Sequence, residues 1–249
     1  MEVIPARIFN MLYVYLDIVW LFILLVIFLI KKRYIAVIAG LAGGLIYFII
    51  DYGIFYLALG TRTVQGAQPA MLLLWLSLSY GFTNFAWIWL WLDRDGYAVE
   101  WSLLIISGWF TVALLSRNFG SSFQIISISR GTSSYHGVMA LILLAGYGIL
   151  ILKNIRSADK RNTENIILPD SQDARYKYTS KKINILWILA IGILVQFSWE
   201  AVLLITGIRP AGVVPLIVDS LLETNLGLPY LFLIHRAISS KFKENLVRI

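Results

Sequence analysis

The chain has 249 residues, of which 59% are hydrophobic and only 14% are charged, and this composition excludes an ordinary soluble domain. The absence of cysteine excludes disulfides and thiol catalysis, and the two histidines, His136 and His235, are too few for a histidine-rich metal centre. We therefore expect no metal and no cofactor. The net charge of +7 comes from basic residues in loops beside apolar runs, which is typical of membrane topology signals rather than of nucleic-acid binding.

Seven apolar segments are long enough to cross a bilayer, which takes about 20 residues of helix. They cover residues 7–30, 34–59, 70–92, 99–116, 137–153, 183–206 and 211–235. We expect that the first segment is not a cleaved signal peptide, because no basic stretch precedes it and Lys31, Lys32 and Arg33 follow it. The sequence therefore predicts an all-α, multi-pass protein of the cell membrane with seven transmembrane helices.

The basic residues indicate which ends of these helices face the cytoplasm. All but five of the 21 Lys and Arg residues follow the first, third, fifth or seventh segment. The five others lie at the opposite ends of the segments: Arg7, Arg62, Arg117, Arg130 and Arg209. Because cytoplasmic loops carry the excess of Lys and Arg, we expect the N-terminus outside and the C-terminus in the cytoplasm.

The two parts of the chain resemble each other in sequence. Pro69 precedes Asn84 in the third segment, and Pro210 precedes Asn225 in the seventh segment at the same spacing. A Gly-x-Arg sequence comes before each proline, and the segment before it carries one carboxylate. We interpret this pattern as a three-helix unit that occurs twice. A fourth helix between the units makes the second copy parallel to the first.

This 3+1+3 plan divides the chain into three parts. Residues 1–92 form the first three-helix repeat, 93–136 the linker helix with an outer loop, and 137–249 the second repeat. The polar stretch 154–182 within the second repeat indicates a flexible cytoplasmic linker. The Ser- and Gly-rich stretch 117–135 is either an outer loop folded over a pocket or a plain connector. Parallel repeats place a binding site at their interface.

Acidic and amide side chains inside the apolar segments mark a candidate site, because such groups are costly in hydrocarbon and indicate function by default. They lie in the outer half of the bilayer or near its midplane: Asp17, Asp51, Asn84, Glu200, Asp219, Glu223 and Asn225. No Lys or Arg lies at matching depth within the segments, so we expect desolvation to keep some of these carboxyls protonated. A protonated carboxyl in an apolar site is a candidate general acid.

Each of these residues also has a structural explanation. Asp17 and the two asparagines could serve only to hold helices together through hydrogen bonds. Function better explains Asp51 and Glu200, because they occupy matching positions in the two repeats. Function is also favoured for Asp219 and Glu223, which share one helix face at i, i+4.

Aromatic residues are the second component of the candidate site. The chain has nine Trp, 13 Tyr and 13 Phe, and many of them should belong to the belts at the membrane surfaces. Others, including Trp87, Trp199 and Tyr52, fall deep within the segments. Aromatic faces attract cations. Buried carboxyls beside aromatic walls therefore suit either a carbocation intermediate or a bound cationic or sugar-like solute.

The run Phe197-Ser198-Trp199-Glu200, followed by Pro210 and Asn225, resembles a motif of the integral-membrane terpene cyclases of fungal meroterpenoid and indole-diterpene pathways. That family also has seven predicted spans. The resemblance implies that an intramembrane acid protonates an epoxide or alkene of a prenyl chain. By motif, Glu200 corresponds to one catalytic acid, and Asp219 is the candidate counterpart of a second acid in a late helix. The family carries its Trp-Glu in the second helix, whereas here it lies in the sixth segment.

The 3+1+3 plan, with an asparagine in the third helix of each repeat, also resembles the SWEET sugar transporters. In that family paired asparagines line a central substrate site. This resemblance implies that Asn84 and Asn225 bind a small neutral or cationic solute. The family's proline kinks are missing from this chain, because the first and fifth segments contain no proline.

Three hypotheses on function remain, because the absence of nucleotide-binding and hydrolase motifs and of a lysine in the seventh segment excludes other classes. The first is an intramembrane enzyme of terpene-cyclase type that acts on a membrane lipid. Its acids and bases would be Glu200, Asp51 and Asp219, its aromatic wall Trp199, Trp87 and Tyr52, and its further substrate-binding residues Asn84, Asn225 and Glu223. The second is a transporter of a small solute, and a signalling or chaperone-like membrane protein is a third reading.

Overall fold

The computed structural model describes residues 7–130, 135–167, 183–210 and 212–247, and seven helical spans in this part of the chain are long and apolar enough to cross a membrane. They are α1 (Met11–Ile30), α2 (Tyr34–Phe48) continued by the π-helix η1 (Ile49–Ala58), α3 (Pro69–Leu92), α4 (Ala98–Phe119), α5 (His136–Ile167), α6 (Ile185–Ile205) and α7 (Val213–Val247). The prediction of a mostly helical, multi-pass membrane protein with seven spans is thus confirmed. Helices α5 and α7 extend beyond the ends of the predicted segments.

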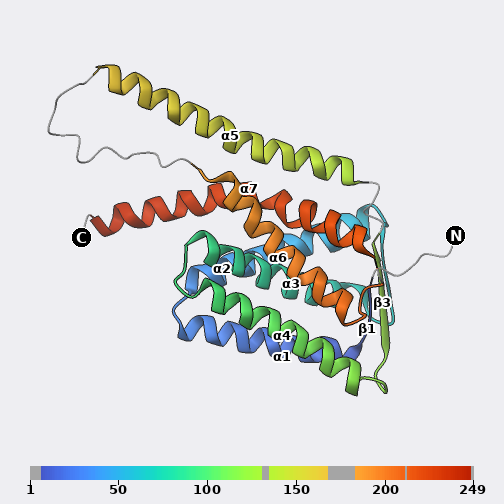
Figure 1. The fold of residues 1–249 in the computed structure, drawn as a ribbon. Coiled ribbons are helices and arrows are strands. Elements are labelled where there is room, and N and C mark those ends of the chain that lie inside the picture. The colour runs from blue at the N-terminus through green and yellow to red at the C-terminus, as the bar shows by residue number, and fades with distance from the viewer. Residues whose placement is uncertain (1–6, 131–134, 168–182, 211, 248–249) are drawn as a thin grey trace.

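Three short strands, which the all-α prediction does not contain, form a sheet at one end of the helix bundle (Figure 1). Strands β1 (Arg7–Asn10) and β2 (Arg62–Gln65) both pair antiparallel with the central strand β3 (Ile125–Arg130). Ile126 and Ile128 of β3 are buried on the inner face of the sheet. The stretch that was predicted as an outer loop or a connector therefore provides the strand that joins the other two. We call this end of the molecule the sheet end.

Helix α3 is the centre of the bundle and contacts α1, α2, α4, α6 and α7. Gly81 of α3 lies against the backbone of Gly44 in α2, and the ring of Phe85 lies against Gly43. Small residues allow such close approach of helix backbones in a membrane. Helix α5, by contrast, packs chiefly on α7 and lies at the outside of the bundle (Figure 1).

Three buried tryptophans connect α3, α4 and α6. The ring of Trp109 lies 5.8 Å from that of Trp87 and 4.7 Å from that of Trp199, measured between centroids and with edge-to-face geometry. Aromatic pairs of this kind contribute about 0.5–1.5 kcal/mol beyond the burial of their area. This cluster helps to pack α6, the helix that carries the candidate acid Glu200, against α3 and α4.

The end of the bundle opposite the sheet is held together by the turn between α3 and α4. Asp93 of this turn lies 2.6 Å from His235 of α7, and Asp95 lies 2.5 Å from Arg33, which precedes α2. The turn therefore links the first two helices to the last one.

Candidate functional site

A cavity of about 510 Å³ lies between α2–η1, α3, α5 and α7, and we call it the lateral groove. Its walls are mostly apolar and include the aromatic side chains of Tyr47, Phe55, Phe85 and Tyr135. Cavities of about 300–1,000 Å³ with apolar walls and a few polar groups are typical of small-molecule sites. The lateral groove is therefore the candidate binding site.

The rim of the lateral groove is apolar and exposed on both sides. On the side of α2 and η1, Ile46 is 50% and Ile54 46% exposed; on α5, Val138 is 56% and Ile142 41% exposed. These residues belong to helices that are apolar enough to cross a membrane. The groove therefore opens sideways, between η1 and α5, toward the surface that would face lipid.

Three of the polar residues singled out in the sequence line this groove together: Asp51, Asn84 and Glu223. Asn84 is 1% exposed, and within the part of the chain that the structure describes neither atom of its amide has a hydrogen-bond partner. An unsatisfied buried polar group costs about 1–3 kcal/mol. A ligand in the groove can supply the missing partner.

Asp51 lies at the start of the π-helix η1 and is held by an arginine from the sheet. Its carboxylate Oδ2 lies 3.1 Å from a guanidinium nitrogen of Arg62, and both side chains are at least nine-tenths buried. Gly60, with φ of 61°, ends the helical span and turns the chain so that β2 carries Arg62 back over Asp51. π-Helical turns are rare in proteins, and those that occur are often found at functional sites.

Glu200 is completely buried and contacts two arginines. It forms an ion pair with Arg209, which follows α6 after Gly207 with φ of 75°, and its carboxylate lies 3.7 Å from the guanidinium of Arg7 in β1. The guanidinium of Arg7 also lies over the ring of Trp199, 5.6 Å from its centroid. Such neighbours offset part of the cost of burying a charged group.

The expectation that no arginine neutralises the buried carboxylates was therefore wrong. Arg62 and Arg209 lie outside the apolar segments in sequence, and Arg7 is the first residue of the first segment; in the structure Arg7 and Arg62 lie in strands and Arg209 follows α6. The sheet and the turn after α6 fold over the end of the bundle, and the long side chains then reach the carboxylates. Counting residues along a helix gives the depth of each carboxylate but does not reveal these arginine contacts. Such a count places the segments between helices outside the membrane.

Gln196, a residue that the sequence analysis overlooked, joins the polar side chains of three helices. Its Oε1 accepts hydrogen bonds from Tyr80 of α3 and from Thr224 of α7, the latter at 2.5 Å. Its Nε2 donates to Glu200 at 3.3 Å and to Glu223 at 3.2 Å. The fully buried amide of Gln196 thus connects the groove-lining Glu223 to the arginine-held Glu200. The sequence does contain a signal for Gln196: it lies four residues before Glu200, and residues at i and i+4 share a helix face.

Asn225 and Asp17 are not among the residues that line the lateral groove. Asn225 accepts a hydrogen bond from the hydroxyl of Tyr147 at 3.0 Å and donates to the carbonyl of Ser220, so it joins α5 to α7. Asp17 accepts a hydrogen bond of 2.9 Å from the indole of Trp75 and joins α1 to α3.

The three predicted aromatic residues also lie elsewhere. Trp87 donates a hydrogen bond of 2.8 Å to Ser102 in α4, and Trp199 packs against Trp109. Tyr52 stacks between Phe48 and Tyr56 along its own helix. The side chain of Asp219, predicted as an assisting acid or base, lies outside the described residues.

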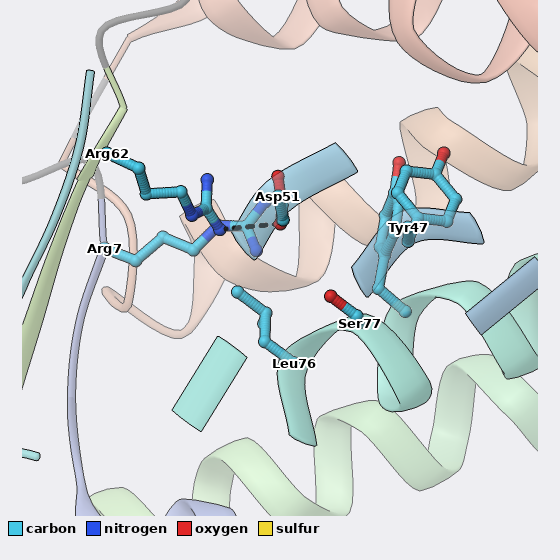
Figure 2. Close-up of a pocket in the computed structure, with 7 residues that line it drawn as sticks. Arg7, Tyr47, Asp51, Arg62, Leu76 and Ser77 are labelled. Atoms are coloured by element: carbon cyan, nitrogen blue, oxygen red, sulfur yellow. Dashed lines mark ion pairs between the residues drawn. The ribbon is translucent and has the colours of Figure 1, made fainter. Parts of the chain in front are cut away.

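A second, much smaller cavity lies beneath the sheet, and we call it the polar pocket (Figure 2). Its volume is about 10 Å³, and it is lined by Arg7, Tyr47, Asp51, Arg62, Leu76, Ser77 and Tyr80. Tyr47 and Asp51 line both the polar pocket and the lateral groove. The two cavities are therefore neighbours, separated by the side chains of Tyr47 and Asp51.

Among the described residues, no three His, Cys, Asp or Glu side chains lie close enough together to hold a metal ion. No known protein family matches the chain, and no curated protein or solved structure matches it either.

Proposed function

We propose that this protein is an intramembrane enzyme of terpene-cyclase type, which takes an isoprenoid lipid from the bilayer and cyclises it in the lateral groove. The observation that carries this proposal is the lateral groove itself, which is apolar, opens sideways between η1 and α5, and has carboxyl groups on its wall. A prenyl chain dissolves in the bilayer, so a sideways opening suits its uptake. An axial, water-filled opening would suit a soluble substrate instead.

In this proposal Glu223, rather than Glu200, is the acid that protonates the substrate. Glu223 lines the groove and accepts a hydrogen bond from Gln196. Glu200 is not among the residues that line the groove, and its carboxylate is paired with Arg209 and Arg7. Glu200 therefore serves to hold the two arginines and Gln196 in place.

The proposed reaction is an isomerisation. The carboxyl group of Glu223 donates a proton to a terminal alkene carbon of the prenyl chain, which leaves a carbocation on the neighbouring carbon. The π electrons of a second double bond in the chain attack this cation, and a ring closes. The final cation loses a proton from an adjacent carbon to the carboxylate of Asp51, which forms a new double bond. One proton enters and one leaves, so the product has the mass of the substrate.

Aromatic rings support the cationic steps of this reaction. The groove is lined by Tyr47, Phe55, Phe85 and Tyr135. A desolvated cation over an aromatic face is stabilised by about 2 kcal/mol or more. These four residues take the role that the sequence analysis assigned to Trp87, Trp199 and Tyr52, none of which is among the residues that line the groove.

Mass spectrometry of lipid extracts tests the proposal. Cells that express the wild type should contain an isomer of a native isoprenoid that cells without the protein lack. Glu223→Gln should lower its amount by at least about 100-fold, the usual contribution of a general acid. Glu100→Gln, a change at an exposed residue at the start of α4, is the matched control and should leave it unchanged. Identical lipid profiles with and without the protein would contradict the enzyme proposal.

A transporter of a small solute is the second candidate, and the observation that favours it is the amide of Asn84 in the groove wall, which has no hydrogen-bond partner among the described residues. The two asparagines of the SWEET-like reading are not both on this cavity, since Asn225 binds Tyr147. In this case Asn84→Ala should lower solute flux into proteoliposomes, and the solute should be recovered unaltered. A chemically changed solute would contradict transport.

We also propose that the chain is built from two three-helix repeats with the sheet end outside the cell. Helix α2 packs on α3 as α6 packs on α7. In each pair the first helix carries a buried carboxylate, which an arginine after a positive-φ glycine contacts. The excess of Lys and Arg at the opposite end of the bundle supports the orientation.

A further inference from the structure

The polar pocket contains a buried hydroxyl group whose hydrogen-bonding capacity is unused. Ser77 of α3 is 1% exposed, and within the described chain its Oγ has no hydrogen-bond partner. Figure 2 shows this hydroxyl on the side of α3 that faces Asp51 and the two arginines. Buried hydroxyl groups normally have a partner, so this site calls for one.

Arg7, on the other side of the polar pocket, is also incompletely used. Its side chain is 10% exposed, and its guanidinium makes a long ion pair of 3.7 Å with Glu200 and a contact with the ring of Trp199. A guanidinium has five N–H donors. Arg7 can therefore donate a hydrogen bond to a group in the pocket while it keeps both contacts.

The size of the polar pocket limits what it can take. Its volume of about 10 Å³ is close to the smallest space that holds one water molecule. The occupant is therefore a single oxygen-sized group, and a phosphate with its four oxygens is too large. Tyr47 and Asp51 border both this pocket and the lateral groove, so the group can belong to a molecule whose apolar part fills the groove.

We propose that the polar pocket binds the terminal hydroxyl group of an isoprenoid alcohol whose chain lies in the lateral groove. This inference rests on the proposed function and names its substrate class. The alcohol oxygen accepts hydrogen bonds from the hydroxyl of Ser77 and the guanidinium of Arg7. The alcohol proton is donated to a carboxylate oxygen of Asp51. All hydrogen-bonding positions of a hydroxyl group are then filled.

The same arrangement discriminates against related lipids. A ketone or an ether oxygen has no proton to donate, so its lone pairs would face the carboxylate of Asp51 without compensation. A phosphate monoester is both too large for the pocket and of the same charge as that carboxylate. Hydrogen-bonding sites reject analogues that leave their polar groups unpaired more strongly than apolar sites reject analogues of different length.

Ligand binding to the full-length protein in phosphatidylcholine nanodiscs tests the inference. The probe is a tritiated twenty-carbon prenyl alcohol, displaced by the unlabelled alcohol, its methyl ether, its phosphate monoester or the corresponding hydrocarbon. We expect the alcohol to bind at least about ten-fold more tightly than the methyl ether and the hydrocarbon. Neither of these two can form the full set of hydrogen bonds in the pocket, and the lost bonds account for a factor of about this size. In Ser77→Ala the alcohol should lose most of this advantage, while the affinity for the hydrocarbon stays unchanged.

The control for Ser77→Ala is the loss of a serine hydroxyl group elsewhere in the bundle. Ser198→Ala removes a half-buried hydroxyl that, within the described residues, donates to the carbonyl of Leu194 in its own helix, and it should keep the preference for the alcohol. Equal binding of alcohol, ether and hydrocarbon would overturn the hydroxyl site but leave the groove as a lipid site. Tightest binding of the phosphate monoester would overturn the choice of an alcohol. Binding of none of the four lipids would overturn the groove proposal as well.

Discussion

The guanidinium of Arg62 lies 3.1 Å from the carboxylate of Asp51, and neither side chain is more than 10% exposed. The chain contains the same arrangement a second time, between Arg209 and Glu200. In both pairs the carboxylate lies in a helix and the arginine follows a glycine with φ of 61° or 75°. Buried ion pairs contribute little net stability, but the loss of one partner leaves an uncompensated charge. Each pair is therefore a point where a single substitution has a large effect.

The first prediction concerns the pair in the second half of the chain. Arg209→Met should destabilise the protein by about 3–5 kcal/mol, because it removes the arginine that contacts the completely buried carboxylate of Glu200 more closely than Arg7 does. The double variant Arg209→Met, Glu200→Gln should recover much of this loss, since the charge is then removed as well. The free energy of unfolding by sodium dodecyl sulfate in mixed micelles is the measurement.

Arg156→Met, at an exposed position of α5, is the control for the general effect of losing a positive charge. It should change the free energy of unfolding by less than about 0.5 kcal/mol. A double variant that is no more stable than Arg209→Met would show that Glu200 is not the reason for the destabilisation.

The helical spans could be predicted because the length of an apolar segment alone decides whether it can cross a bilayer. The carboxylates could be found because charged groups are rare in such segments. The arginines that bind them could not, because Arg7 and Arg62 lie in strands whose pairing through residues 125–130 is a long-range contact. Strands of four to six residues are too short for a hydrophobic periodicity that would predict this pairing.

Which polar residues share a cavity was also beyond the sequence. Asn84 and Asn225 occupy matching sequence positions, yet Asn84 lines the groove, whereas Asn225 is bonded to Tyr147 in α5. The difference arises because α5 lies at the outside of the bundle and packs chiefly on α7 (Figure 1). Equivalent positions in a sequence pattern therefore need not have equivalent neighbours.

Gln196 carries the second prediction. Gln196→Leu removes the group that bonds Tyr80, Thr224, Glu200 and Glu223 at once. We expect a loss of about 3 kcal/mol in the free energy of unfolding, the upper range for groups left unsatisfied in the interior. Gln124→Leu, at an exposed position before β3, should be nearly neutral and is the control. Equal stability of the two variants would contradict the central role of this amide.

The packing of α2 on α3 gives the third prediction. A methyl group on Gly81 would collide with the backbone of Gly44, so Gly81→Ala should destabilise the protein by about 1–3 kcal/mol even though alanine is the better helix former. Gly53→Ala is the matched control, because its methyl group would meet nothing within 4 Å. That variant should be neutral or slightly more stable. Thermal unfolding in detergent separates the two, and the reverse order would mean that α2 and α3 do not pack as described.

The proposed orientation can be measured directly, because the chain has no cysteine of its own. Ser121→Cys places a thiol at an exposed position of the sheet end, and Gly96→Cys places one at an exposed position of the turn between α3 and α4. A membrane-impermeant maleimide should label the first in intact cells and the second only after the cells are opened. Labelling in the opposite order would invert the topology and would place the polar pocket on the cytoplasmic side.

The sideways opening of the lateral groove gives the last prediction. Val138 lies on the rim of the groove in α5 and is 56% exposed. Val138→Trp should narrow the opening and lower the binding of the prenyl alcohol by at least about ten-fold. Its stability should change little, because the added ring stays in contact with lipid. Leu141→Trp, at a 68% exposed position of the same helix that does not line the groove, is the control and should bind normally. If both variants bind like the wild type, the ligand does not pass between η1 and α5, and a route from the aqueous side would replace the lateral one.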